Sequence, residues 1–304
     1  MRALYTSILL CVCLVFAGTS FAQPSCDQQI TVNVRDSRGE FVADLHASSF
    51  HAKVGGHEAA VTSANIFAGS NRLTLVIDAS SSMSGNRDMQ RWRTIKTLTE
   101  QIVASVPTST ELAMLVFNSR TIRKVEFGHS RKELLNTIEQ LPDANGTTPL
   151  WNSLLEASKM FGSPAPGNAV LVISDFVDNT SNTDAAKVRS AFLENSIRLF
   201  GVGVGSLDVI AEDRVGQADF FALVKQTGGD VIQDVGKYRG DAYRGAALLR
   251  QLLEEPGRFY VLKITPPSPL QKPERLNLSI FPDDHKRNNG MSLYYPAKVS
   301  QCGQ

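Results

Sequence analysis

Two apolar runs dominate the pattern of hydrophobic and polar positions along the chain. Residues 73–77 and 168–174 are mostly apolar and rich in β-branched side chains, which is typical of strands buried on both faces of a parallel sheet. Each run ends at an acid, the first at Asp78 and the second at Asp175. In open α/β sheets the carboxyl ends of the strands are where ligands bind. The pattern therefore places both acids where a binding site is expected.

The chain around these runs alternates between strand-like and helix-like spacing. Further strands are predicted at 112–117, 121–127 (an edge strand), 197–204 and 230–233. Helices are predicted from near Asn86 to Val103, after Ser130 as a cap, and at 150–161, 185–195, 218–226 and 241–255. This alternation predicts an α/β fold with a mostly parallel sheet between two layers of helices, connected by right-handed crossovers.

The two ends of the chain have β character instead. Ile30, Val32 and Val34 alternate with polar residues, and short strand-like runs continue through 45–54 and 59–66, broken at Gly55-Gly56. After Pro256, strands are predicted at 258–265, 275–281 and 291–295. The chain thus divides into β segments at 23–70 and 257–304 and an α/β domain at 71–256.

The first 22 residues have the features of a secretory signal peptide. Arg2 precedes an apolar stretch from Ile8 to Ala17, and Ser20-Phe21-Ala22 provides a cleavage site before Gln23. The stretch is too short to cross a bilayer, and no other segment approaches a membrane span. We expect an exported protein, either secreted or periplasmic.

Removing 22 residues from 304 leaves 282, with 30 basic and 30 acidic residues because Arg2 is the only charge removed. This balance argues against nucleic acid or a membrane surface as the partner. The cysteines that remain, Cys26 and Cys302, stand near the two ends of the mature chain. In an oxidising compartment they predict one disulfide between the termini, and two unrelated exposed thiols are the alternative.

Oxygen-bearing side chains follow the first apolar run at once. Asp78, Ser80 and Ser82 form an Asp-x-Ser-x-Ser pattern on one short loop, and such oxygens suit a hard divalent cation such as Mg²⁺. A second turn, Gly146 to Leu150, leads into a helix. Pro149 fits the first helical position there, so Thr148 is expected at the cap with its hydroxyl free to face a neighbouring loop.

These residues together resemble the metal-ion-dependent adhesion site of the von Willebrand factor A domain. The resemblance implies a Rossmann-like fold and a bound Mg²⁺, Mn²⁺ or Ca²⁺. It assigns the metal ligands as Asp78, Ser80, Ser82, Thr148 and Asp175. Two positions depart from the family: Thr147 replaces its second glycine, which leaves open whether Thr147 or Thr148 is the ligand, and Phe176 replaces the glycine after its last Asp, so the turn there is expected to differ.

The end segments resemble a group of exported bacterial proteins related to the same domain. The Asp36-Ser-Arg-Gly39 turn, the step from Leu45 to Phe50, and a Tyr260-Val-Leu strand followed by Tyr294-Tyr295 carry this likeness. It implies that the two ends pair into one small β module with the A domain inserted between them. A Cys26–Cys302 bond would then hold that module closed.

Three functions compete for this sequence. In the family, an Asp or Glu from a protein ligand completes the coordination of the metal, which implies an adhesion-type binding module without enzymatic activity. A structural component of an envelope or secretion complex, with the ion only joining loops, is the first alternative. A metal-dependent hydrolase is the second; it is disfavoured because Ser80 stands where aspartyl nucleophile enzymes carry a second acid.

Overall fold

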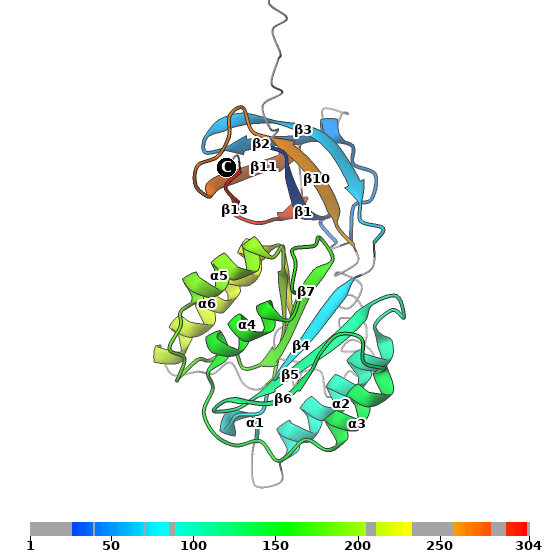
Figure 1. Cartoon of the computed structure of the whole chain (residues 1–304), viewed down its shortest axis with the longest axis vertical. Coiled ribbons are helices and arrows are strands. Elements are labelled where there is room, and N and C mark those ends of the chain that lie inside the picture. The colour runs from blue at the N-terminus through cyan, green and yellow to red at the C-terminus, as the bar shows by residue number, and fades with distance from the viewer. Residues whose placement is uncertain are drawn as a thin grey trace, which may run out of the picture.

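The computed structural model describes residues 26–38, 40–69, 71–84, 89–204, 211–232, 258–280 and 290–302, without the side chains of 211–216. The predicted signal peptide, the helix start near Asn86 and the helix at 241–255 lie outside these residues. The described chain contains two sheets, one covered by α-helices and one that carries only a short 3-10 helix, η1 (Ala47–Ser49) (Figure 1).

The first sheet has six strands in the order β6-β5-β4-β7-β8-β9. They are β6 (Thr121–Val125), β5 (Glu111–Phe117), β4 (Arg72–Asp78), β7 (Asn168–Ser174), β8 (Arg198–Gly203) and β9 (Val231–Ile232). All neighbours run parallel except the edge strand β6, which is antiparallel to β5. The two apolar runs form the central strands β4 and β7, because their side chains are buried on both faces.

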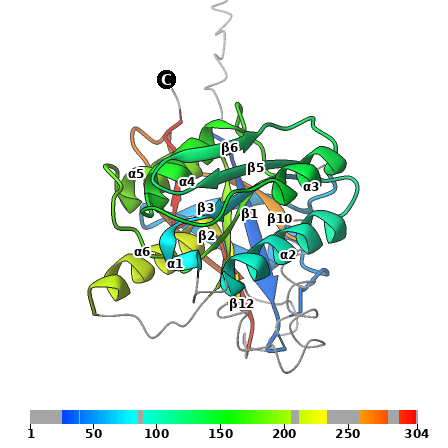
Figure 2. The ribbon, with the colours of Figure 1, turned by 90° about the horizontal axis from the view of Figure 1, so that it is seen from below.

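Helices cover both faces of this sheet (Figure 2). On one face, Ile95 and Ile102 of α2 (Gln90–Ser105) and Leu134 of α3 (Arg131–Glu139) join the core. The other face packs against α4 (Leu150–Lys159), α5 (Ala185–Glu194) and α6 (Ala211–Thr227). Ser130 caps α3, since its hydroxyl accepts from the Glu133 N–H while the Glu133 carboxylate accepts from the Ser130 N–H. The predicted α/β architecture is confirmed.

The second sheet combines the two ends of the chain. Its order is β12-β1-β10-β3-β2-β11-β13 and every pairing is antiparallel. The strands are β1 (Gln28–Arg35), β2 (Phe50–Val54), β3 (His57–Ile66), β10 (Tyr260–Thr265), β11 (Glu274–Ile280), β12 (Ser292–Tyr294) and β13 (Lys298–Val299). Strands from the amino- and carboxyl-terminal segments lie next to each other, so the predicted shared β module is confirmed.

Strand β1 is buried on both faces, although its alternating sequence predicts one solvated face. Thr31, Asn33 and Arg35 are buried as well as the apolar residues between them. Arg35 forms an ion pair of 2.8 Å with Asp230, beside β9 of the other sheet, and Asn33 donates to the Arg258 carbonyl oxygen. The polar face of β1 is therefore covered by the A domain.

The chain enters and leaves the A domain through one packed junction. Phe67 follows β3, Phe259 precedes β10, and their rings stack with centroids 4.6 Å apart. The guanidinium of Arg198, a buried residue at the start of β8, lies 3.8 Å from the Phe259 ring centroid. This stacking of rings and guanidinium fixes the β module against the sheet of the A domain.

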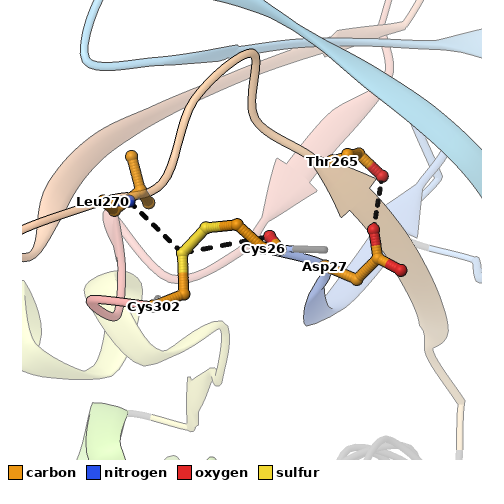
Figure 3. Close-up of a disulfide and its surroundings, with 5 residues drawn as sticks. All are labelled: Cys26, Asp27, Thr265, Leu270 and Cys302. Carbon is orange, nitrogen blue, oxygen red and sulfur yellow. Dashed lines mark hydrogen bonds between the residues drawn. A yellow bond between two sulfur atoms is a disulfide. The ribbon is translucent and has the colours of Figure 1, made fainter. Parts of the chain in front are cut away.

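The predicted disulfide between Cys26 and Cys302 is present (Figure 3). Their Cα atoms are 5.4 Å apart, within the range that a disulfide spans. Next to it, the Asp27 carboxylate pairs with Lys263 at 2.6 Å and accepts a hydrogen bond of 2.7 Å from the Thr265 hydroxyl. The bond therefore closes the β module across the first and last described residues.

Several predicted boundaries were wrong. A short helix, α1 (Ser81–Ser84), was not predicted, and Met89, which the prediction placed inside a helix, is the N-cap of α2, which begins at Gln90. Helix α6 begins at Ala211, seven residues earlier than predicted, and strand β13 was not predicted. Pro149 is the N-cap residue of α4 and not its first helical residue, because its ψ of 65° is not helical; Thr148 therefore lies before the cap. No helix in the described part is long and apolar enough to cross a membrane.

Candidate metal centre

The candidate site lies where β4 and β7 end, at the edge of the sheet that faces away from the β module (Figure 1, at α1). Three segments meet there: residues 79–82, which connect β4 to the start of α1, residues 145–149 before α4, and residues 175–181 after β7. The Ser81 N–H donates to Gly146 O at 3.0 Å and the Asn145 N–H donates to Ala79 O at 2.8 Å. Backbone hydrogen bonds therefore already join the first two segments.

Asp78 is the last residue of β4 and its side chain is fully buried. One carboxylate oxygen accepts from the Ser174 hydroxyl at 2.6 Å, and the other accepts from the Ser80 N–H at 2.8 Å. Burial, followed by the nearby charge of Asp175, raises the pKa of Asp78 to about 7 even though these hydrogen bonds lower it. A buried carboxylate of this kind is stabilised in its ionised form by a cation.

The two serines carry the site from the interior to the surface. Ser80 is buried and Ser82 is exposed, and their hydroxyl oxygens are 3.1 Å apart. The Ser82 hydroxyl also lies close enough to the Asp175 carboxyl group to lower the pKa of that group. Asp78, Ser80, Ser82 and Asp175 are therefore brought together, as the sequence predicted.

Asp175 follows β7 and is half-buried. Burial raises the pKa of its carboxyl group, while hydrogen bonds from the Ser82 hydroxyl and the Val177 N–H and the charge of Arg91 lower it. The Gln217 side chain of α6 donates to the Asp175 carbonyl oxygen at 2.8 Å. The loop that carries Asp175 is thus contacted by Ser82 of α1 and by Gln217 of α6.

The two threonines of the turn before α4, Thr147 and Thr148, have different surroundings. Thr147 is exposed, and its hydroxyl hydrogen-bonds to those of Ser119 at 3.2 Å and Thr180 at 3.1 Å. Thr148 is buried, and its N–H donates to the Asn179 side chain at 2.8 Å. Within the described residues the Thr148 hydroxyl has no hydrogen-bond partner. It is therefore the one available as a ligand.

The turn after Asp175 has a backbone that favours glycine. Phe176 has φ of +64°, in the left-handed region, so a bulky residue occupies the conformation that glycine adopts freely. Its ring is fully buried and stacks on Phe220 of α6, with centroids 4.2 Å apart. Gly201 of β8 leaves room for this pair, since a Cβ there would lie 2.9 Å from the Phe176 ring.

The donor set suits a hard divalent cation. It consists of two carboxylates and three neutral hydroxyls, the oxygen ligands that Mg²⁺, Mn²⁺ and Ca²⁺ prefer, and it lacks the imidazole and thiolate ligands that favour zinc. Among the described residues no group of three or more His, Cys, Asp or Glu side chains could hold a metal. A site here would therefore depend on the serine and threonine hydroxyls.

Sequence reasoning missed residues that support these donors. Ser174 is the strongest example, since its hydroxyl holds the Asp78 carboxylate at 2.6 Å; a serine as the last residue of an apolar strand was the available signal. Asn179 and Asp178 bind the backbone of the threonine turn and of α4, at Thr148 and Trp151. Gln217 comes from a distant helix and left no signal in the pattern.

The fold and these loops define a class of protein, an α/β domain with a polar loop cluster at one edge of its sheet. The sequence model of the von Willebrand factor type A domain matches residues 73–224, half of the chain, and the chain belongs to this family. Domains of this family are in general protein-interaction and adhesion modules and are mostly not enzymes. No curated protein sequence matches the chain.

Solved structures to which the chain is similar include a von Willebrand factor type A protein from Catenulispora acidiphila, at 14% identity over 92% of this chain and 75% of the other, with a TM-score of 0.47. An aerotolerance-related membrane protein from Bacteroides fragilis has 17% identity over 61% of this chain and 99% of the other, with a TM-score of 0.46. The pilus adhesin SpaC from Lactobacillus rhamnosus GG, in an open conformation, has 13% identity over 69% of this chain and 34% of its own, with a TM-score of 0.43.

Proposed function

We propose that this chain is an exported protein-binding module that recognises its partner through a divalent cation. The ion, Mg²⁺ or else Mn²⁺ or Ca²⁺, is held by the side chains of Asp78, Ser80, Ser82, Thr148 and Asp175. The partner supplies the carboxylate of an Asp or Glu. The observation that carries the proposal is the fully buried carboxyl group of Asp78, which Ser174 and the Ser80 N–H hold in place and which a cation would stabilise in its ionised form.

The charge of the donor set explains why an acidic ligand would bind. Two carboxylates balance the charge of one divalent ion, and the hydroxyls add none. When bound, the ion would act as a Lewis acid, and because the site has no excess negative charge, it would accept one more anionic oxygen. Ser82 is the exposed member of the set, so this edge of the site is accessible from solvent.

A purely structural role for the ion is less well supported. The loops are already joined without it, by Ser81 to Gly146, by Asn145 to Ala79, and by Thr148 to Asn179, whose N–H in turn donates to Thr148 O at 3.1 Å. An ion is therefore not needed to hold them together, which favours a role in ligand binding. Hydrolysis is disfavoured by Ser80, a neutral residue at the position of the second acid.

Export rests on residues 1–22 and fits the disulfide. A Cys26–Cys302 bond persists in an oxidising compartment such as the periplasm or the extracellular space. The function is tested by capturing partners from that compartment with the purified protein, in Mg²⁺ and in chelator. Cation-dependent capture supports the proposal, and capture that is equal in chelator contradicts it.

A further inference from the structure

Arg91 lies beside the candidate site without belonging to it. It stands in the first turn of α2, and its guanidinium Nη1 donates a hydrogen bond of 2.5 Å to the carbonyl oxygen of Ser82. The Ser82 hydroxyl in turn lies 3.1 Å from that of Ser80, another proposed ligand. Arg91 therefore places a permanent positive charge directly beside the exposed end of the proposed ligand set.

Arg91 lies against the segment that carries the proposed ligands Ser80 and Ser82, because its guanidinium contacts the Ser82 carbonyl oxygen. A guanidinium has five N–H donors, and within the described residues Arg91 uses one of them, toward Ser82. Arg91 is only half-buried, so its other donors are open to a ligand that approaches the exposed side of the site.

We propose that Arg91 is a second anchor for the ligand's carboxylate, with one carboxylate oxygen bound by the cation and the other by the guanidinium. This rests on the proposed function and names a residue that selects the ligand. Guanidinium and carboxylate match in shape and charge, and paired N–H donors make such contacts directional. Arg91 also balances the extra negative charge that an acidic ligand brings to a site already neutral.

The proposal has a signature that a merely structural role lacks. A positive charge next to a cation weakens cation binding, so Arg91→Ala should bind Mn²⁺ about two- to threefold more tightly. The same change should weaken carboxylate binding by about threefold or more, because a partly exposed charge pair is lost. A residue that only supports the loops would weaken both when removed.

The experiment uses the full-length protein with Mn²⁺ and acetate as probes. Electron paramagnetic resonance measures Mn²⁺ affinity, and the relaxation of acetate methyl protons by bound Mn²⁺ measures carboxylate binding, at constant ionic strength. Arg93→Ala is the matched control, since Arg93 is an exposed arginine on the same helix. Arg91→Lys keeps the charge and loses the fork of donors, so it should keep the parent's Mn²⁺ affinity and bind acetate less well.

The outcomes separate the two proposals. Opposite changes in Mn²⁺ and acetate binding for Arg91→Ala, with none for Arg93→Ala, support the second anchor. Parallel losses, or acetate binding equal to that of the parent, overturn it while leaving the metal site in place. A parent protein that binds no Mn²⁺ overturns the proposed function itself and the anchor with it.

Discussion

At the scale of single residues, the local partners of each side chain decide its role more than its place in a motif. Thr147 and Thr148 are adjacent and chemically identical. The hydroxyl of Thr147 hydrogen-bonds to Ser119 and Thr180, whereas that of Thr148 is available to a ligand. The Asp-x-Ser-x-Ser pattern could be predicted because its members are close in sequence. Ser174 was not assigned to Asp78, which lies 96 residues away, because the family resemblance that connects Asp78 with Asp175 does not include this serine.

This difference between the threonines gives a direct prediction. Thr148→Ala should weaken Mg²⁺ binding clearly, by about tenfold if one ligand contributes about 1.4 kcal/mol. Thr147→Ala should leave Mg²⁺ affinity within about twofold of the parent, since its hydroxyl serves neighbouring loops. Calorimetric titration of both variants measures this. A larger loss in Thr147→Ala would assign the ligand to Thr147.

At the scale of elements, the strands and the starts of α3, α4 and α5 were predicted well, whereas α6 begins seven residues earlier than predicted. Strands β4 and β7 are continuous apolar runs, a pattern that burial on both faces imposes. A helix start without a capping pattern is harder to predict: α2 follows Met89, whose backbone is left-handed and whose side chain forms no capping hydrogen bond. Strand β13, with two residues, is too short to leave a pattern.

The stack of Phe176 on Phe220 links α6 to the loop of Asp175. Its net contribution to stability is the difference between the burial of the ring and the strain of the left-handed backbone at Phe176. Phe176→Gly would remove a left-handed strain of about 1–2 kcal/mol but lose a buried ring worth about 3–5 kcal/mol. The lost ring packing should outweigh the relieved strain, so the free energy of unfolding of the variant should be about 2 kcal/mol lower than that of the parent. Urea unfolding with chelator present measures it. A variant more stable than the parent would show that strain outweighs the stack.

At the scale of the whole molecule, the β module and the candidate site lie at opposite ends of the A domain (Figure 1). The pairing of the two chain ends in one sheet could be predicted, because the ends resemble a group of exported bacterial proteins and each end carries one cysteine, Cys26 or Cys302. The packing of β1 against the A domain could not be predicted, because an alternating sequence indicates only one buried face. The partner of Arg35, Asp230, also lies 195 residues away in the sequence.

The disulfide should therefore matter for stability and not for metal binding. Replacing both Cys26 and Cys302 by Ser should lower the free energy of unfolding by about 3–5 kcal/mol, because the bond closes a very long loop. Mg²⁺ affinity of the folded variant should equal that of the parent. Denaturant unfolding and metal titration measure the two effects. Intact-mass measurement without reductant that finds two free thiols in the parent would contradict the pairing.

The central claim is that a cation held by Asp78 recognises the partner. Asp78→Asn tests it most directly, since the amide oxygen can still accept a hydrogen bond within this buried site while the charge is lost. Partner capture from the secreted or periplasmic fraction should be strong for the parent in Mg²⁺, and absent for the parent in chelator and for Asp78→Asn in either condition. Capture by Asp78→Asn equal to that of the parent, with both indifferent to chelator, would contradict the account.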